Sequence, residues 1–206
     1  MSRSGAPRVL TEMDRETECA LVGRLREGDA DAFDAIHEAF RARLFTFLLR
    51  LSRRRDVAED LLEETWLRLV KHAPRLRPDT RLGPWLFTVA RHLHVSYVRS
   101  RVLEDSAVTS LIALWPFSVE QSSPFEATAA NELQRRIERA LASMSATSRE
   151  VLLLVAVGGL DHGDAADVCG ITPEALRQRL SRARAALARA LEDGRSGARV
   201  LGEVTP

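Results

Sequence analysis

The sequence predicts an all-α protein of two small helical domains, a four-helix domain and a helix-turn-helix domain, joined by a flexible linker. Ala, Leu and Arg dominate its 206 residues and aromatic residues make up only 5%, a composition that favours helices. Apolar residues recur at helical spacing in several segments, and between residues 102 and 127 that spacing is lost. The chain is long enough for two such domains.

The first domain is expected to cover residues 17–101, after a flexible tail at residues 1–16. A helix over residues 17–27 ends at Gly28, a residue that tolerates the backbone of a helix end. Asp29 then caps a long second helix, whose expected inner face comprises Phe33, Ile36, Phe40, Leu44, Phe47, Leu48 and Leu51.

The third helix is predicted over residues 57–72, where Asp56 and Glu59 form a pattern like a capping box. Residues 75–82 are predicted to be a loop. Pro84 suits the first position of a fourth helix that runs to about residue 101. Four helices with short connections make one compact domain.

Residues 102–127 are predicted to be the linker, because they carry Pro116 and Pro124 and show no clear period. A chain of about 25 residues spans at most roughly 80–90 Å, enough to join two modules bound one or two duplex turns apart. An apolar patch at residues 111–117 makes this segment too apolar to be only a solvent-exposed connection.

The second domain is expected over residues 128–193, followed by a tail at residues 194–206. One helix covers residues 129–142. Another opens at Thr147, with Glu150 three residues later in capping-box spacing, and ends at the glycine pair 158–159.

A helix-turn-helix completes this domain. Asp161 can cap its first helix, Gly170 can take the tight turn, and Thr172 before Pro173 is a cap followed by a favoured first helical residue. Leu176, Leu180, Ala183, Leu187 and Leu191 then fall on one face. In this motif the second helix enters the DNA major groove.

Charge is distributed unevenly although the net charge is only +1. Residues 173–191 hold five Arg against Glu174, whereas residues 102–134 hold no Lys or Arg and five acidic residues. The basic second helix can therefore meet DNA. Arg177 suits guanine and Gln178 suits adenine, while Arg182 and Arg184 are expected on phosphates. The residues assigned to duplex DNA are Thr172, Glu174, Arg177, Gln178, Ser181, Arg182 and Arg184.

No apolar run is long enough to cross a bilayer, and the N-terminus lacks a signal-peptide core. We therefore expect a cytoplasmic protein without membrane insertion. Cys19 and Cys169 lie far apart, with no Cys or His at ligand spacing, so neither a metal, a cofactor nor a disulfide is expected.

Several motifs together resemble RNA polymerase sigma factors of the extracytoplasmic-function (ECF) type. They are DLLEETWL at residues 60–67, LRPDT at 76–80, WLFTVARHL at 85–93, SREVLLL at 148–154 and RLSRAR at 179–184. The resemblance covers residues 19–192. It implies that the first domain is sigma region 2, which binds core polymerase and melts the −10 element, and that the second is sigma region 4, which reads the −35 element. The acidic linker would then thread the polymerase's basic channel; the alternative is a disordered tether.

The resemblance assigns the third helix to core RNA polymerase. Asp60, Glu63 and Glu64 form an acidic outer face beside Trp66 and Arg68, which suits a charged coiled coil on the partner. The same residues would also fit a solvent-exposed acidic face that binds no partner, so the assignment to polymerase depends on the resemblance.

The loop at residues 76–80 falls where the family captures a flipped base of the −10 element. Such capture needs a shaped pocket with polar edges. The residues assigned to −10 DNA are Arg77, Asp79 and Thr80 on the loop, with Arg91, His92, Ser96 and Arg99 on the fourth helix. His92 and Pro78 differ from the family's usual residues, so the sequence leaves the preferred base open. The second helix of the helix-turn-helix also starts differently from the family's common form, at Pro173, so the preferred −35 sequence is left open as well.

Three other functions remain open. A stand-alone helix-turn-helix regulator would bind DNA without polymerase, and a sigma-like protein could be sequestered or degenerate. A metal-dependent hydrolase would use Asp161, His162 and Asp164, or His92 and His94, but no partner stands at motif spacing.

The resemblance also implies an anti-sigma factor that covers both domains in the resting cell.

Overall fold

The computed structural model describes residues 14–108 and 129–200, with side chains at residues 14–101 and 132–192. These residues form helices and no strand, which confirms the all-α, two-domain fold. The elements are α1 (Arg15–Arg26), α2 (Ala30–Ser52), α3 (Arg55–His72), η1 (Ala73–Arg75) and α4 (Leu82–Val108), then α5 (Ala129–Ser143), α6 (Ala146–Ala156), α7 (His162–Cys169) and α8 (Pro173–Val200). None of these helices is long and apolar enough to span a bilayer.

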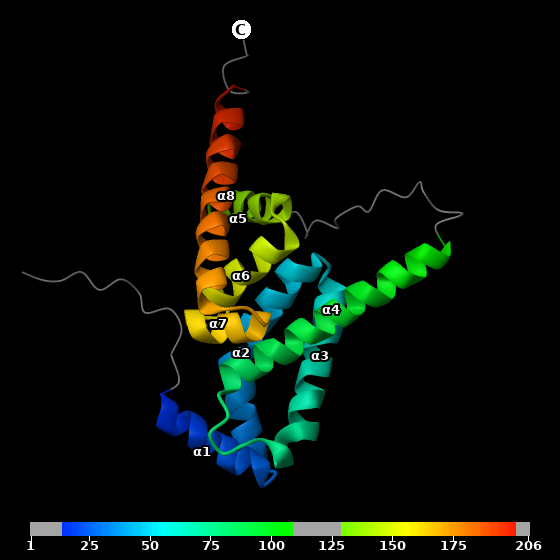
Figure 1. Ribbon diagram of the computed structural model, residues 1–206, viewed down its shortest axis with the longest axis vertical. Coiled ribbons are helices and arrows are strands. Elements are labelled where there is room, and N and C mark those ends of the chain that lie inside the picture. The colour runs from blue at the N-terminus through cyan, green and yellow to red at the C-terminus, as the bar shows by residue number, and fades with distance from the viewer. Residues whose placement is uncertain (1–13, 109–128, 201–206) are drawn as a thin grey trace, which may run out of the picture.

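Helices α1 to α4 pack into one bundle (Figure 1), in which α2 contacts α1, α3 and α4. Ile36, Leu44 and Phe47 of α2 are fully buried. Phe47 meets Phe87 of α4 edge to face, with 5.2 Å between ring centroids, a geometry that aromatic rings favour. The inner face predicted for α2 is confirmed except at Phe33, which is only partly buried.

Two helix starts in this domain bear on the predicted caps. Asp29 caps α2 as expected, because its carboxylate accepts the Asp31 and Ala32 N–H groups at 2.9 and 3.2 Å. The capping box predicted at Asp56 and Glu59 is wrong. The cap position of α3 is Arg54, and the two carboxylates form ion pairs with arginines instead, Asp56 with Arg54 and Glu59 with Arg55.

Helix α4 is longer than predicted at both ends. It starts at Leu82 rather than Pro84. Pro84 then occupies the third helical position, where its missing N–H costs nothing because the first N–H groups have no partner within the helix. The helix continues to Val108 because residues 102–108 contain no Gly or Pro to end it. The apolar patch at residues 111–117 lies outside the described residues.

In the second domain, α6 and α7 pack against α8, and α5 packs against α8. The three helix-turn-helix signals are confirmed. Asp161 accepts the Asp164 N–H at 2.8 Å, Gly170 adopts φ 65°, and Thr172 accepts the Ala175 N–H at 3.2 Å. The capping box at Thr147 and Glu150 is wrong, since Ser145 caps α6 by accepting the Ser148 N–H at 3.3 Å.

The two domains contact each other through α2 and α4 on one side and α6 and α7 on the other (Figure 1). Leu160, in the α6–α7 turn, is buried. A Cβ on Gly83 would lie 3.5 Å from Leu160 and 3.6 Å from Phe40. Gly159, at φ +64°, would place a Cβ only 2.8 Å from the Arg43 guanidinium. The close approach therefore requires glycine at position 159, whereas a Cβ at position 83 would make ordinary van der Waals contacts.

Arg149 fixes the junction between α5 and α6. Its side chain is buried and donates to the carbonyl oxygens of Leu141, Ala142 and Met144 at 2.8, 3.3 and 3.0 Å. The Leu141 carbonyl also accepts the Met144 N–H at 3.2 Å. The carbonyls of Ala142 and Met144 lie in the last turn of α5 and just after it, where the helix supplies no N–H partner.

We predict that Arg149→Ala lowers the free energy of unfolding by about 2–4 kcal/mol, because three buried carbonyls lose a charged donor. Urea unfolding followed by circular dichroism measures this loss. Arg139→Ala is the matched control, because Arg139 on α5 forms an exposed ion pair with Glu132 worth about 0–1 kcal/mol. Equal losses for the two variants would contradict the role given to Arg149.

Candidate nucleic-acid interface

The exposed face of α8 carries the residues predicted to meet duplex DNA. All of them are solvent-exposed, namely Thr172, Glu174, Arg177, Gln178, Ser181, Arg182 and Arg184. Leu176, Leu180 and Ala183 are buried on the opposite face and hold α8 against α6 and α7. Gly170 sets the turn from α7 into α8. The α7–α8 pair therefore presents an exposed helix in the manner of a helix-turn-helix.

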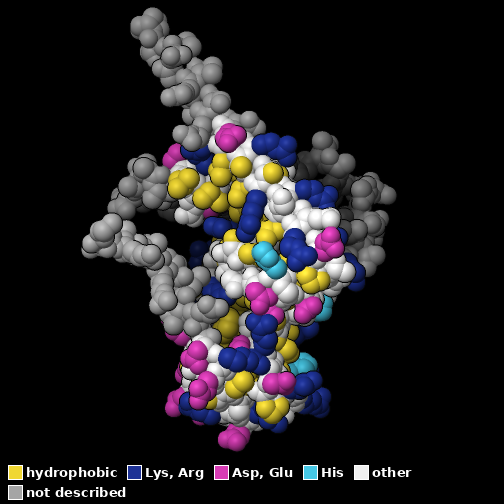
Figure 2. Space-filling view, turned by 60° about the vertical axis from the view of Figure 1, so that its left-hand side comes forward, with side chains coloured by type: hydrophobic (Ala, Val, Ile, Leu, Met, Phe, Trp, Pro, Cys, Tyr) yellow, Lys and Arg dark blue, Asp and Glu magenta, His cyan; other side chains and the backbone are white. Residues whose placement is uncertain are grey.

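Basic and acidic side chains are interspersed on the molecular face shown in Figure 2. Basic side chains, in dark blue, run through its upper half, and acidic ones, in magenta, are densest towards its lower end. That lower end holds α1 in Figure 1.

A second exposed face lies on α4. His92, Ser96 and Arg99 are exposed and stand at i, i+4 and i+7, so they share one side of the helix. They supply donors and acceptors suited to a nucleic-acid strand.

Arg91 points away from that face, towards the second domain. It forms an ion pair with Glu150 of α6 at 2.9 Å, and the two side chains are only 22% and 13% exposed. Beside this pair, burial and the Glu150 charge raise the pKa of Cys169 to about 11. Burial, with Arg149 and Arg91 nearby, lowers the pKa of His94. The sequence grouped Arg91 with His92; the structure separates the two.

The α3–α4 loop, residues 76–81, is an ordered turn. The Thr80 N–H donates to the Arg77 carbonyl at 3.0 Å. The side chains of Arg77 and Asp79 bond each other at 3.1 and 3.2 Å while both remain exposed. The Arg77 and Asp79 side chains predicted for this loop are therefore at the surface and paired with each other, whereas Thr80 is half-buried.

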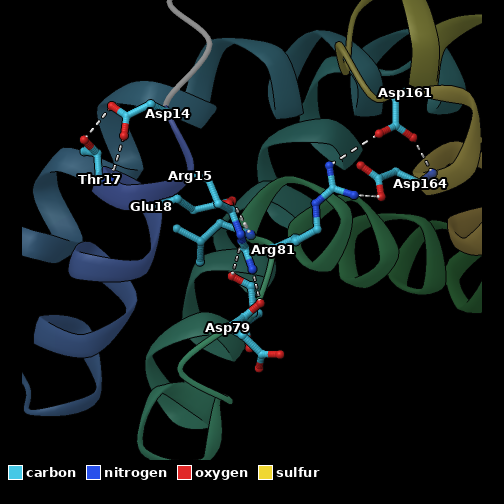
Figure 3. Close-up of polar contacts among 10 residues, drawn as sticks. Asp14, Arg15, Thr17, Glu18, Asp79, Arg81, Asp161 and Asp164 are labelled. Carbon is cyan, nitrogen blue, oxygen red and sulfur yellow. Dashed lines mark hydrogen bonds and ion pairs between the residues drawn. The ribbon is translucent and has the colours of Figure 1, made fainter.

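Arg81, at the end of this loop, was not among the predicted residues. Its guanidinium bonds Asp161 at 3.4 Å and also Asp164 (Figure 3). Burial raises the pKa of Asp164, and the Arg81 charge opposes that rise. The hydrogen bond from the Asp164 N–H lowers the pKa of Asp161. Both carboxylates considered for a metal-dependent hydrolase thus bind Arg81, and the Asp161 carboxylate also caps α7.

Arg15 and Glu18 of α1 also contact the loop region, although the sequence assigned residues 1–16 to a frayed tail. Arg15 bonds the backbone carbonyls of Asp79 and Thr80, and Glu18 bonds the Leu82 N–H (Figure 3). These partners lie 64 or 65 residues apart in sequence, so no local pattern could have indicated them.

Helix α3 presents both charge and an apolar groove. Asp60 and Glu63 are exposed, and Glu64 pairs with Arg68 at 2.9 Å. Trp66 was predicted on the outer face, but it is only 8% exposed. It packs against Phe33 and His37 of α2, with centroid distances of 6.1 and 4.9 Å.

The groove lies between α2 and α3 and has a volume of about 310 Å³. Its lining comprises Phe33, His37, Leu62, Trp66, Leu67 and Val70, with Glu59 and Glu63. Leu67 and Val70 are 58% and 55% exposed. The prediction missed these two residues. The signal that could have found them is the presence of large apolar residues, Leu67 and Val70, on the predicted outer face of this helix.

Comparison with protein families gives two matches. The model described as Sigma-70 region 2 matches residues 36–103, and the model described as Sigma-70, region 4 matches residues 134–187. The first range covers α4 up to residue 103 and the α3–α4 loop; the second covers α7 and the part of α8 that carries the exposed face.

Two solved structures share the fold. CnrH in complex with the cytosolic domain of CnrY has a TM-score of 0.64 and 21% identity, covering 85% of this chain and 97% of that one. The sigma factor RpoE in complex with the anti-sigma factor NepR from Bartonella quintana has a TM-score of 0.58 and 24% identity, covering 86% and 95%.

Curated relatives are similar over most of the chain. The ECF RNA polymerase sigma factor SigC of Mycobacterium tuberculosis is 31% identical over 188 residues, which cover 86% of this chain and 92% of the relative. The RNA polymerase sigma factor CarQ of Myxococcus xanthus is 33% identical over 168 residues, covering 77% and 88%. With both sigma regions present in order, this chain belongs to the ECF family of RNA polymerase sigma factors.

Proposed function

We propose that this protein binds core RNA polymerase, directs it to a two-part promoter and stabilises strand opening, without covalent chemistry of its own. The observation that supports this proposal is that both sigma regions are present on one chain and that each carries an exposed polar face, on α8 and on α4 with its preceding loop. Residues 17–101 act as sigma region 2 and residues 128–193 as sigma region 4, with residues 102–127 as the connection.

The α8 face is proposed to read the −35 element. Arg177 and Gln178 are exposed near the start of α8, where a recognition helix contacts base edges. Arg182 and Arg184 are placed to bind phosphates, which fixes register without reading sequence.

The α3–α4 loop and the outer face of α4 are proposed to bind the opened −10 element. A flipped base needs polar edges and a fixed pocket. Arg77, Asp79 and Thr80 offer those edges, and His92, Ser96 and Arg99 continue the surface along α4. Arg91 joins this surface only after it leaves Glu150.

Helix α3 is proposed to bind core polymerase. The groove between α2 and α3 combines apolar walls with the acidic side chains of Glu59 and Glu63. A partner helix with apolar and basic residues would bury Leu67 and Val70 and meet these carboxylates. Asp60, Glu64 and Arg68 extend the contact along the same helix.

An anti-sigma factor is proposed as a further partner. The two solved structures of similar fold are complexes, one of them with a protein described as an anti-sigma factor. Failure to recover any tight inhibitory partner by pull-down would count against it. Because its proposed partners are polymerase and chromosomal DNA, the proposed location is the cytoplasm.

Reconstitution with core RNA polymerase tests the function. The purified protein and core polymerase are mixed with genomic DNA, and transcript starts are mapped. Starts downstream of a shared two-part motif are expected. DNA binding without polymerase-dependent initiation would favour the stand-alone regulator or a degenerate sigma-like protein.

We predict that Arg177→Ala weakens discrimination at one −35 base by about 1–3 kcal/mol, because a side chain that reads a base edge is lost. Competition binding of holoenzyme to promoter variants measures this. Arg189→Ala is the control, because Arg189 is exposed on α8 beyond the predicted contact residues. An unchanged base preference would remove Arg177 from readout.

We predict that Glu150→Gln increases the affinity of the free protein for single-stranded −10 DNA about fivefold. The substitution removes the ion pair with Arg91, so DNA binding no longer has to break an interaction worth roughly 1 kcal/mol. Fluorescence anisotropy with a labelled oligonucleotide measures the change. Glu132→Gln, which removes an exposed carboxylate paired with Arg139, should leave affinity unchanged. Identical affinity for Glu150→Gln and the original protein would show that the pair does not compete with DNA.

A further inference from the structure

The α3–α4 loop has few contacts of its own that fix its position. Its internal bonds are the Thr80 N–H to the Arg77 carbonyl and the Arg77–Asp79 side-chain pair. That side-chain pair is 82% and 65% exposed, and exposed ion pairs hold geometry weakly. Leu76 is buried at one end of the loop, and Arg81 pairs with Asp161 and Asp164 at the other. The segment between these two ends is therefore the part that needs an external support.

Helix α1 supplies that support from the side of the loop opposite Asp161 and Asp164 (Figure 3). The Arg15 guanidinium donates to the carbonyl oxygens of Asp79 and Thr80, the latter at 3.4 Å. Two consecutive carbonyls held by one planar group fix both the place and the orientation of that peptide. The backbone of the loop is thus held just where two predicted base-contacting side chains begin.

Glu18 holds the point where the loop becomes α4. Its carboxylate accepts the Leu82 N–H at 2.6 Å, which is the first N–H of α4 and has no partner within the helix. Glu18 is only 12% exposed and also accepts from Arg15 at 2.6 Å. Arg15 and Glu18 thereby act as one unit on both ends of the residue 79–82 segment.

The position of this unit is itself determined by the fold. Asp14 caps α1 by accepting the Thr17 N–H at 2.9 Å, next to Arg15. Leu21, Val22 and Leu25 bury the inner face of the helix, and α1 packs on η1 at the base of the loop. Arg15 and Glu18 therefore start from a fixed helix rather than from a tail.

We infer that α1 is a working part of the −10 site, with Arg15 and Glu18 as positioning residues for the loop that captures the unpaired base. The inference rests on the proposed function of the loop. Neither residue needs to touch DNA. Each contributes by keeping the loop in its base-receiving form before DNA arrives, so that binding need not order it.

The test compares Arg15→Ala and Glu18→Ala with Arg26→Ala and Glu16→Ala. The control residues lie on the same helix and are exposed. Each variant is assembled with core polymerase on a promoter found by the reconstitution experiment. Open-complex formation on duplex promoter is measured with a fluorescent base in the −10 element. Affinity is measured for single-stranded −10 oligonucleotides that carry each base at the captured position.

We expect Arg15→Ala and Glu18→Ala to assemble with polymerase normally and to open the promoter about tenfold less, the effect of losing one hydrogen bond to a charged group. Discrimination among bases at the captured position should fall by a similar factor, while −35 duplex affinity stays constant. The two control variants should match the original protein in every measurement.

Three results would overturn the inference. The first is unchanged opening and discrimination in both α1 variants. The second is an equal loss of affinity for all four bases, which would show general damage rather than loop positioning. The third is a loss of polymerase assembly with a lower melting temperature. If the original protein itself fails to initiate with core polymerase, the proposed function fails instead, so the two failures are distinguishable.

Discussion

The ion pairs between Arg81 and the carboxylates of Asp161 and Asp164 join the end of the α3–α4 loop in the first domain to the start of α7 in the second. Asp164 is 93% buried by its neighbours, with 7% of its surface exposed, and a carboxylate in that setting is tolerated as an ion only beside a positive charge. Leu160 packs on Gly83 next to this junction. The contact thus combines a charge pair with apolar packing, and the placement of α7 against α4 depends on it.

This junction divides the proposed surfaces into accessible and covered ones. The exposed face of α8 and the groove between α2 and α3 lie away from it and remain open to partners. Arg91 lies within it and is held by Glu150. In this arrangement the second domain occupies one cation of the proposed −10 surface with a carboxylate, much as a phosphate would.

The predicted N-terminal caps are confirmed at some helices and wrong at others. Asp29, Asp161 and Thr172 cap helices as expected, because the bond they make spans only two or three residues. The capping boxes assigned to Asp56–Glu59 and Thr147–Glu150 were wrong, because the cap positions are Arg54 and Ser145, two residues earlier in each case. An arginine partner does not by itself prevent capping, since Asp29 and Asp161 cap their helices while pairing with Arg24 and Arg81.

The sequence by itself determined the helices, the helix-turn-helix, the exposed face of α8 and the family, since periodicity, caps and motif order are all local properties. Only the tertiary structure decided that Trp66 lines a groove, that Arg91 pairs with Glu150, and that Arg15 and Glu18 hold the α3–α4 loop. The polar contacts among these join residues 59 to 65 positions apart. The packing of the helices determines these partners. The sequence around a charged side chain does not indicate which opposite charge, far away in the chain, will lie beside it in the folded protein.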